Sequence, residues 1–551
     1  MGILTSKQVL EKQVKDLRIR LENREGKAEL AMATMESDLI AAKTQLKEKD
    51  TIISILQREI AALTKELEAA KNLSAEAVQE LIDKKVASAV AEATASLTDE
   101  LTKAHAEIAR LKAIINKDST NSSKPPGQNG FKRHQNNSRE KSGRPRGGQP
   151  GHPGHRLGLP ENLDELVAQG VVQMQVVDHT SGDSEYVSRY VIDIEVMTTI
   201  TEHRFTVGMQ LPKGMYNEVS YGDLTKATTV LLLNEGIIAE KRLSDMFAGL
   251  TLGAVTISPA TLERFQSQFA DKLESSGELE AIKEDLLIGE VMCTDDTPMR
   301  CAETIEFNED GKMITRTEEG KSFTATVRTH SNDRSTFYTV NPKKDKEGVE
   351  RDGVLPRYFG TLCQDDEAKF YNYGKENGTC GGHLCRDLKG LRDLQLIQWA
   401  GDMRTYMQDM NRHKNRDLLE SKTECDPELL EGFERGYVDL VERGRAELGL
   451  MNKGDFGFDE FNAMVNRLTK RRDNYLLFMR NYEVPFTNNL AERDLRVEKT
   501  KQKVSLLFRT WNGITNHAKT RSFLSTVKKR KGNLFDSIVR VFNGEKVLQG
   551  Q

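Results

Sequence analysis

The acidic residues that follow short apolar runs are the side chains of this sequence best suited to chemistry. The segment VMCTDDTPM places Asp295 and Asp296 after one apolar run, and LCQDDEAKFYN places Asp365 and Asp366 after another. A further acid, Glu492, lies in NNLAERDLR, which has the pattern of a helix. Each acid alone is typical of an ordinary turn or surface position. Together they predict carboxylates that separate elements carry to one place.

Carboxylates from separate elements are what a pair of divalent cations needs. Two ions about 4 Å apart need an aspartate that bridges them and further acids around them. Mg²⁺ prefers hard oxygen ligands and keeps several waters, so three acids suffice. Such a site activates water or a 3′-hydroxyl and stabilises the leaving oxygen in a displacement at phosphorus.

The segment CGGHLCR contains a second group of potential ligands. Cys380, His383 and Cys385 supply three of the four ligands that a structural zinc site takes, and no obvious fourth lies nearby. Close helix packing near the acids is the alternative interpretation, and we expect zinc to be absent.

The net charge of −4 conceals two basic regions. Residues 119–156 carry eight Lys/Arg against one acid, and residues 492–546 carry fourteen against five. Such segregation indicates contact with a polyanion, with solvated charge as the alternative. Arg133, Arg144 and Arg146 lie in a Gly/Pro/Ser-rich stretch that is typical of a flexible linker.

The N-terminal fifth of the chain has the spacing of a coiled coil. Apolar residues alternate at intervals of three and four from Met32 to Ala70, and again from Leu97 to Ile115. Water disfavours an exposed apolar stripe. We therefore expect residues 1–116 to drive self-association.

The sequence predicts a multidomain α+β protein. Ser258 and Pro259 predict the start of a helix, as its cap and first residue. The expected parts, in chain order, are a coiled coil (1–116), a basic linker (117–160), a small domain (161–220), a helical region that permits a helix-turn-helix (221–285), the first part of an α/β core (286–390), a helical insertion (391–484) and the last part of the core with basic helices (485–551).

The composition excludes a membrane-spanning protein and a disulfide-rich one. No apolar run is long enough to cross a bilayer, and no signal-peptide apolar region opens the chain. Six cysteines in 551 residues do not make a disulfide framework. We expect a soluble protein of a reducing compartment.

Taken in order, these segments resemble the insertion-sequence-66 family of DDE transposases. The resemblance begins at YGDLTKATTVLLLNEG and passes through TDDTPM, QDDEAKFYN and CGGHLCR to NNLAERDLR; it includes the coil followed by NSSKPP and GGQPGHPGH. It implies a ribonuclease-H-like catalytic core interrupted by a helical insertion. It also implies the cutting and joining of DNA at the ends of a mobile element.

The resemblance assigns roles to individual acids. Asp295 matches the first catalytic acid, although the family's next residue, Glu, is Asp296 here. Asp366 matches the second because it stands five residues before Tyr371, and Glu492 matches the third. The three acids would hold two Mg²⁺ or Mn²⁺ ions.

Further roles follow from the same resemblance. Cations beside the third acid would bind DNA phosphates together with the linker arginines: Arg493, Arg496, Lys499 and Lys503. Cys380, His383 and Arg386 match the family's Cys-x-x-His segment and are candidate structural residues. The family's small cysteine zinc finger is missing, because residues 160–215 contain no cysteine.

The implied partner is double-stranded DNA, both the element's terminal inverted repeats and its target. A homo-oligomer formed through the coil and small accessory proteins are further expected partners, with no membrane, in the cytoplasm and nucleoid of a prokaryotic cell. Two alternatives stay open: a catalytically inactive DNA-binding or scaffolding relative, and a structure-specific nuclease with the same core. The presence of all three acids opposes the first alternative.

Overall fold

The computed structural model describes residues 53–65, 75–116, 159–179, 187–211 except 193, 195 and 196, 217–307, 313–317 and 322–548. Residues 53–65 and α2 (Ala75–Asn116) are helical, as the heptad spacing predicts. Most of the first apolar seam lies outside the described residues, as do Arg133, Arg144 and Arg146 of the linker. Pairing of the coil with a second helix stays a prediction.

The segment 159–220 contributes little regular structure. Its described residues include one short helix, α3 (Leu163–Ala168), and no strand. Apolar side chains such as Val176 and Ile194 are about as exposed as in an extended chain, at 90% and 91%. A folded small domain at 161–220 therefore stays a prediction.

Helices occupy residues 223–287, as predicted. The Ser258 hydroxyl accepts a hydrogen bond from the N–H of Thr261, and Pro259 is the first helical residue, so the predicted helix start is confirmed. The Phe269 ring meets the Phe523 ring edge-on and the Phe542 ring at a tilt, which joins this region to the C-terminal helices. The bounds are α4 (Asp223–Asn234), α5 (Glu240–Leu250), α6 (Pro259–Ser275), α7 (Glu278–Leu287), α15 (Trp511–Lys529) and α16 (Leu534–Phe542).

Five strands form a mixed sheet with strand order β5-β4-β1-β6-β7. The first three of these strands are antiparallel, whereas β6 and β7 run parallel to β1. A separate hairpin consists of β2 (Glu303–Phe307) and β3 (Met313–Thr317). The sheet bounds are β1 (Val291–Cys301), β4 (Phe323–Ser331), β5 (Thr336–Asn341), β6 (Thr361–Gln364) and β7 (Glu376–Thr379).

The long strand β1 tolerates a proline because its neighbours change along its length. Its pairing with β6 covers Val291 to Cys293, so β6 no longer accompanies it at Pro298. No ladder bond is lost on that side. The edge strand β5 is covered in turn by α15, whose Ser522 and Thr526 hydroxyls accept hydrogen bonds from backbone N–H groups of the strand at 2.9 and 3.1 Å.

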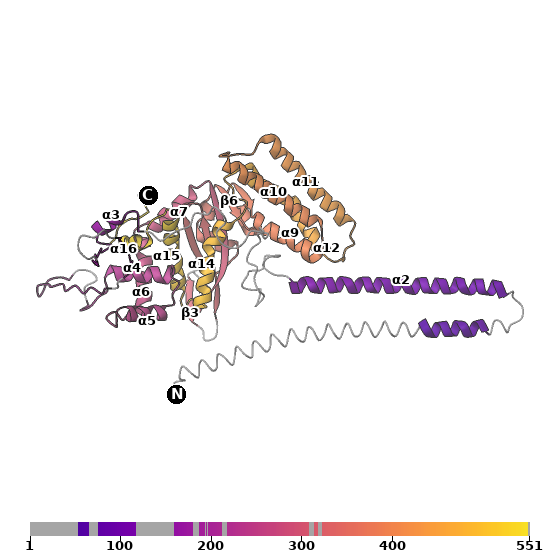
Figure 1. Cartoon of the computed structure of the whole chain (residues 1–551), viewed down its shortest axis with the longest axis horizontal. Helices are drawn as coiled ribbons and strands as arrows, with labels where there is room; N and C mark the ends of the chain where they lie inside the picture. The colour runs from indigo at the N-terminus through magenta and orange to yellow at the C-terminus, as the bar shows by residue number, and fades with distance from the viewer. Residues whose placement is uncertain are drawn as a thin grey trace, which may run out of the picture. The chain divides into compact units, whose positions relative to one another are not determined.

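A lobe of five helices lies between β7 and α14 (Asn489–Ser505) and has its own apolar core. The helices are α9 (Gly381–Gln395), α10 (Trp399–Leu419), α11 (Pro427–Gly449), α12 (Phe458–Lys470) and α13 (Arg472–Arg480). Its first helix begins at Gly381, before the predicted boundary at 391. Helix α13 contacts β7, and α9 to α12 gather on that side of the sheet (Figure 1). The short connections before the lobe are α8 (Lys346–Asp352), η2 (Leu355–Arg357) and η3 (Ala368–Asn372).

Within the described ranges, no helix combines the length and the apolar character that crossing a membrane requires.

Candidate active site

The register between β1 and β6 brings Asp295 and Asp365 to one face of the sheet. Cys293 lies opposite Cys363, and both cysteines pack with Ala491 of α14. Side chains along a strand alternate between the two faces. Two residues further along each chain, Asp295 and Asp365 therefore return to the face that α14 covers.

Glu492 approaches Asp365 from the first turn of α14. Its neighbour Ala491 is buried against the strand cysteines, which fixes this turn of the helix over the strand ends. One ligand atom from each of four residues lies within 4.8 Å of the other three: Asp365, Cys380, His383 and Glu492. Three chain segments thus converge on one small cluster.

Asn488 connects the parts of this cluster. Its side chain does not cap α14; instead Nδ2 donates to the Thr294 carbonyl at 2.7 Å and to Asp365 Oδ1 at 3.1 Å. Its backbone N–H donates to Cys380 Sγ at 3.2 Å. Because Asn488 is fully buried, these bonds fix Asp365 relative to β1, α9 and α14.

Two basic side chains of α9 face the carboxylates. His383 Nδ1 lies 3.3 Å from Asp365 Oδ1 and 3.6 Å from Glu492 Oε1, in ion-pair range but without an aligned hydrogen bond. Arg386 Nη2 lies 3.7 Å from Glu492 Oε1. Burial by itself lowers the pKa of His383, but the Asp365 carboxylate outweighs it and holds that pKa above its ordinary value.

Asp366, which the sequence spacing favours, does not belong to this cluster in the structure. Its carboxylate accepts hydrogen bonds from Tyr371 at 2.6 Å and Tyr475 at 3.1 Å, on the side of the helical lobe. The tyrosine five residues later is therefore a partner of Asp366 itself. The structure brings Asp365 to the other acids instead, because neighbouring residues at a strand end point in different directions.

Burial and nearby carboxylates both raise the pKa of Asp295. Burial raises this pKa well above its usual range, and the charges of Asp365, Asp296 and Glu492 raise it further. The N–H of Asp296 donates to Asp295 Oδ1 at 2.7 Å and acts in the opposite direction. Nearby negative charge disfavours the ionised form of a carboxyl group.

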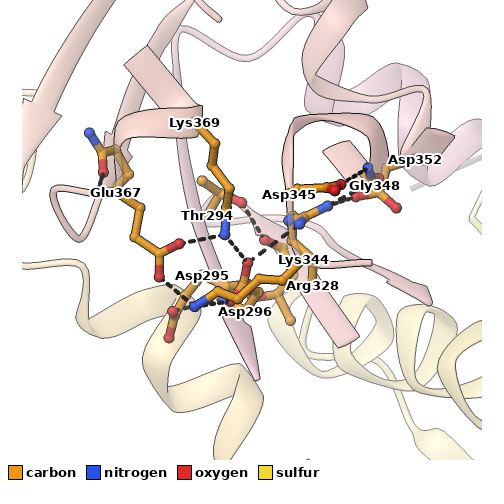
Figure 2. Close-up of polar contacts among 12 residues, drawn as sticks. Thr294, Asp295, Asp296, Arg328, Lys344, Asp345, Gly348, Asp352, Glu367 and Lys369 are labelled. Atoms are coloured by element: carbon orange, nitrogen blue, oxygen red, sulfur yellow. Dashed lines mark hydrogen bonds and ion pairs between the residues drawn. The ribbon is translucent and has the colours of Figure 1, made fainter. Parts of the chain in front are cut away.

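Asp296, in contrast to Asp295, lies among cationic side chains. Burial by itself raises the pKa of Asp296, but Lys369, Lys344 and Arg328 together hold it below its ordinary value. Lys369 Nζ lies 2.6 Å from Oδ2, Lys344 Nζ 3.1 Å from Oδ1 and Arg328 Nη2 3.4 Å from Oδ2. Figure 2 shows these cations around the Asp296 carboxylate. This acid is already neutralised by protein side chains.

The cations predicted to bind DNA phosphates differ in their positions on α14. Arg493, Arg496 and Lys503 are exposed. Lys499 is half-buried; burial lowers its pKa, while the charges of the two aspartates of β1 act in the opposite direction. Lys499 therefore faces the acidic cluster, and the other three present their charge to solvent.

Two thiols lie near the cluster, and one of them belongs to it. Burial raises the pKa of Cys380 far above its ordinary value, and its Sγ accepts the hydrogen bond from Asn488. Burial also raises the pKa of Cys385 to about 12, and this residue is outside the 4.8 Å group found among the described residues. Besides the Cys380 thiol, the group offers the His383 imidazole and the carboxylates of Asp365 and Glu492 as donors.

These oxygen donors fit a hard divalent cation. Asp295, Asp365 and Glu492 offer carboxylates, which Mg²⁺ and Mn²⁺ prefer. Asp365 and Glu492 already lie close together, and the charge of Asp365 acts on Asp295. The amide oxygen of Asn488 is a further oxygen atom at this site, and it is buried with no hydrogen-bond partner among the described residues.

A comparison with protein-family models decides the family. The model of the Transposase IS66 family matches residues 219–516, more than half of the chain. The chain belongs to the IS66 transposase family. The resemblance drawn from the sequence is therefore confirmed, and the matched range contains the whole sheet, the helical lobe and every member of the acidic cluster.

Other comparisons add less about this IS66 family transposase. A family of unknown function (DUF6444) matches residues 47–158. Among solved structures, the Drosophila P element transposase strand transfer complex matches with a TM-score of 0.28 and 9% identity, covering 59% of this chain and 95% of that one. A likeness this weak carries no argument about fold or function. No curated protein matches.

Two members of the cluster were missed by sequence reasoning for different reasons. Asp365 is one half of an acidic doublet, and choosing between the halves requires the register of β6 against β1. Asn488 stands directly before a helix, where asparagine ordinarily caps the first turn. The sequence signals its position but not that its amide turns toward Asp365.

Proposed function

We propose that this chain is a DNA transposase that binds the terminal inverted repeats of a mobile element, cleaves its ends and joins them to target DNA by two-metal-ion phosphoryl transfer. The observation that carries the proposal is the convergence of Asp295, Asp365 and Glu492 on one face of the sheet in an IS66 family chain. This assignment replaces Asp366 with Asp365 as the second acid.

The topology supports a ribonuclease-H-like core. The first acid lies on the central strand β1, the second directly follows the parallel neighbour β6, and the third opens a later helix. The helical lobe between β7 and α14 occupies the place of the expected insertion. The three carboxylates are thus carried on or directly after strands and on a helix, and not by long loops.

The three acids would hold Mg²⁺ or Mn²⁺ ions. Bound divalent cations supply activation of water or a 3′-hydroxyl and neutralisation of the leaving oxygen. The protein's own contribution is positioning. Asn488 orients Asp365, while His383 and Arg386 place positive charge beside Asp365 and Glu492.

DNA is held by cations outside the acidic cluster in this proposal. Arg493, Arg496 and Lys503 are exposed on the helix that carries Glu492, so a phosphate backbone along α14 would pass the acids. Linker residues Arg133, Arg144 and Arg146 would add contacts that depend on salt. Small accessory proteins stay a prediction.

The test is an assay of cleavage and joining on a labelled duplex that carries the inverted repeat found beside the coding sequence. We expect a nick at the element end, then transfer of the freed 3′ end to a second duplex, with Mg²⁺ or Mn²⁺ but not with Ca²⁺, whose looser coordination places the reacting oxygens poorly. DNA binding without cleavage in any metal would indicate a scaffolding relative. Cleavage without joining would indicate a nuclease.

Self-association through the coil forms a separate proposal. Removal of residues 1–116 should lower the number of subunits measured by light scattering, because the apolar seam that pairs the helices is lost. A truncated chain with the same number of subunits as the full chain would show that the oligomer forms elsewhere.

A further inference from the structure

Asp366 has four partners of its own on the side of the helical lobe. The hydroxyls of Tyr371 and Tyr475 donate to its two carboxylate oxygens at 2.6 and 3.1 Å. Arg467 Nε and Arg471 Nε lie 3.7 and 3.9 Å from the same oxygens. This half-buried carboxylate is thus surrounded by donors and cations from the protein itself.

These partners connect several elements. Tyr371 belongs to η3, Arg467 to α12 and Tyr475 to α13. Arg467 also donates to Asp387 of α9 at 2.9 Å, and the guanidinium of Arg471 lies 3.4 Å from the centre of the Tyr371 ring. The contacts of Asp366 therefore reach the helix that supplies the imidazole of the acidic cluster.

Tyr371 and Tyr475 keep the hydroxyl protons that they donate to Asp366. Burial raises the pKa of Tyr371 to about 12 and the pKa of Tyr475 well above its ordinary value. Both hydroxyls therefore stay protonated. Tyr371 is held in turn by Thr379, whose hydroxyl lies 2.9 Å away.

The backbone at Asp366 is left-handed, with a φ of 65°. Residues with a side chain adopt this conformation rarely, although aspartate and asparagine tolerate it better than most. Such a conformation persists where the surroundings hold it. The turn directs the Asp365 carboxylate toward Asn488 and the Asp366 carboxylate toward the lobe.

We propose that Asp366 is a positioning residue: its carboxylate locks the end of β6 to α12 and α13, and the left-handed turn that it holds aims Asp365 at Asp295 and Glu492. The inference rests on the proposed function, because it names what orients the second acid. It explains why an acidic doublet ends β6. One carboxylate serves the cluster and the other anchors the lobe.

The opposing interpretation makes Asp366 itself a metal ligand, and conservative variants separate the two. In Asp366→Asn the amide oxygen still accepts a hydrogen bond and asparagine tolerates the left-handed turn, so we expect cleavage within about threefold of the wild type. In Asp366→Ala both features are lost, and we expect a decrease of at least about tenfold, as for a group that orients a ligand. A metal ligand would lose its charge in both variants, and both would fail equally.

Metal binding gives a readout that does not depend on activity. Electron paramagnetic resonance of free Mn²⁺, titrated with the full chain, should give Asp366→Asn an affinity within about twofold of the wild type. Asp365→Asn should lose at least about tenfold, because a direct ligand is removed. Equal losses in Asp365→Asn and Asp366→Asn would overturn the proposal.

Hydrogen–deuterium exchange tests the anchor even if the wild type cleaves no DNA. Amides of α13 should exchange faster in Asp366→Ala than in the wild type, because the helix loses its tie to β6. Tyr475→Phe, which removes one of the two hydroxyl donors, should show a smaller increase. Unchanged exchange in α13 would overturn the positioning role, whereas an inactive wild type with faster exchange in Asp366→Ala would refute only the proposed function.

Discussion

Replacement of Asp365 with asparagine should abolish strand cleavage while leaving DNA binding almost unchanged. The side chain lies within 4.8 Å of Glu492 in the cluster, and its charge raises the pKa of Asp295. Groups that merely orient a metal ligand contribute about 10–100-fold to metal affinity or activity. A direct ligand should therefore cost more than about 100-fold. Most DNA affinity comes from phosphate contacts elsewhere, so binding should persist.

The measurement pairs a cleavage time course with a gel shift on the same labelled duplex. Asp295→Asn and Glu492→Gln should behave like Asp365→Asn, whereas Asp366→Asn is the matched control from the adjacent position. Circular dichroism of each variant verifies folding. Full cleavage by Asp365→Asn together with loss in Asp366→Asn would restore the assignment drawn from sequence spacing.

Replacement of Arg328 with alanine should greatly lower the folding stability of the protein. This fully buried side chain of β4 pairs with Asp296 at 3.4 Å and with Asp352, and its guanidinium lies 5.6 Å from the centre of the Phe370 ring. Arg328→Ala removes the guanidinium that pairs with the buried Asp352 carboxylate, while Asp296 keeps Lys369 and Lys344. Breaking a buried pair by removing one partner costs about 3–5 kcal/mol, so the denaturant midpoint of the variant should fall strongly.

Arg357→Ala is the matched control, because Arg357 pairs with Glu280 and Glu284 while half of its side chain is exposed. Water screens such pairs, and the midpoint should hardly change. The double variant Arg328→Ala/Asp352→Ala should be less destabilised than the sum of its single variants, because the two residues interact directly. Equal midpoints for Arg328→Ala and Arg357→Ala in urea unfolding followed by circular dichroism would contradict the buried network.

The environment of Asp296 also changes how a variant at this position should be interpreted. Asp296→Ala removes the partner of Lys369, Lys344 and Arg328. Such a variant would test the fold as much as the chemistry. Asp366→Asn is therefore the better neutral control for an acidic doublet, since it keeps the shape of the side chain and one of its two acceptor oxygens.

The sequence by itself determined the family and the neighbourhoods of the three acids. The order of TDDTPM, QDDEAKFYN and NNLAERDLR predicts the IS66 family, which the family model confirms. Local signals also predict the helix that starts at Ser258 and Pro259, because capping depends only on adjacent residues. Short apolar runs likewise predict strands before Asp295 and Asp365; Asp365 does follow β6, whereas Asp295 lies within β1, which continues to Cys301.

Only the tertiary structure decided which acid of the second doublet, Asp365 or Asp366, lies beside Glu492. Asp365 and Asp366 have the same chemistry and differ by one position, and one position in a strand reverses the face on which a side chain lies. That face is set by the pairing of Cys293 with Cys363 and by the packing of Ala491 on both, contacts between segments far apart in the chain. Local sequence patterns do not specify such long-range register, because it arises when separate elements pack together.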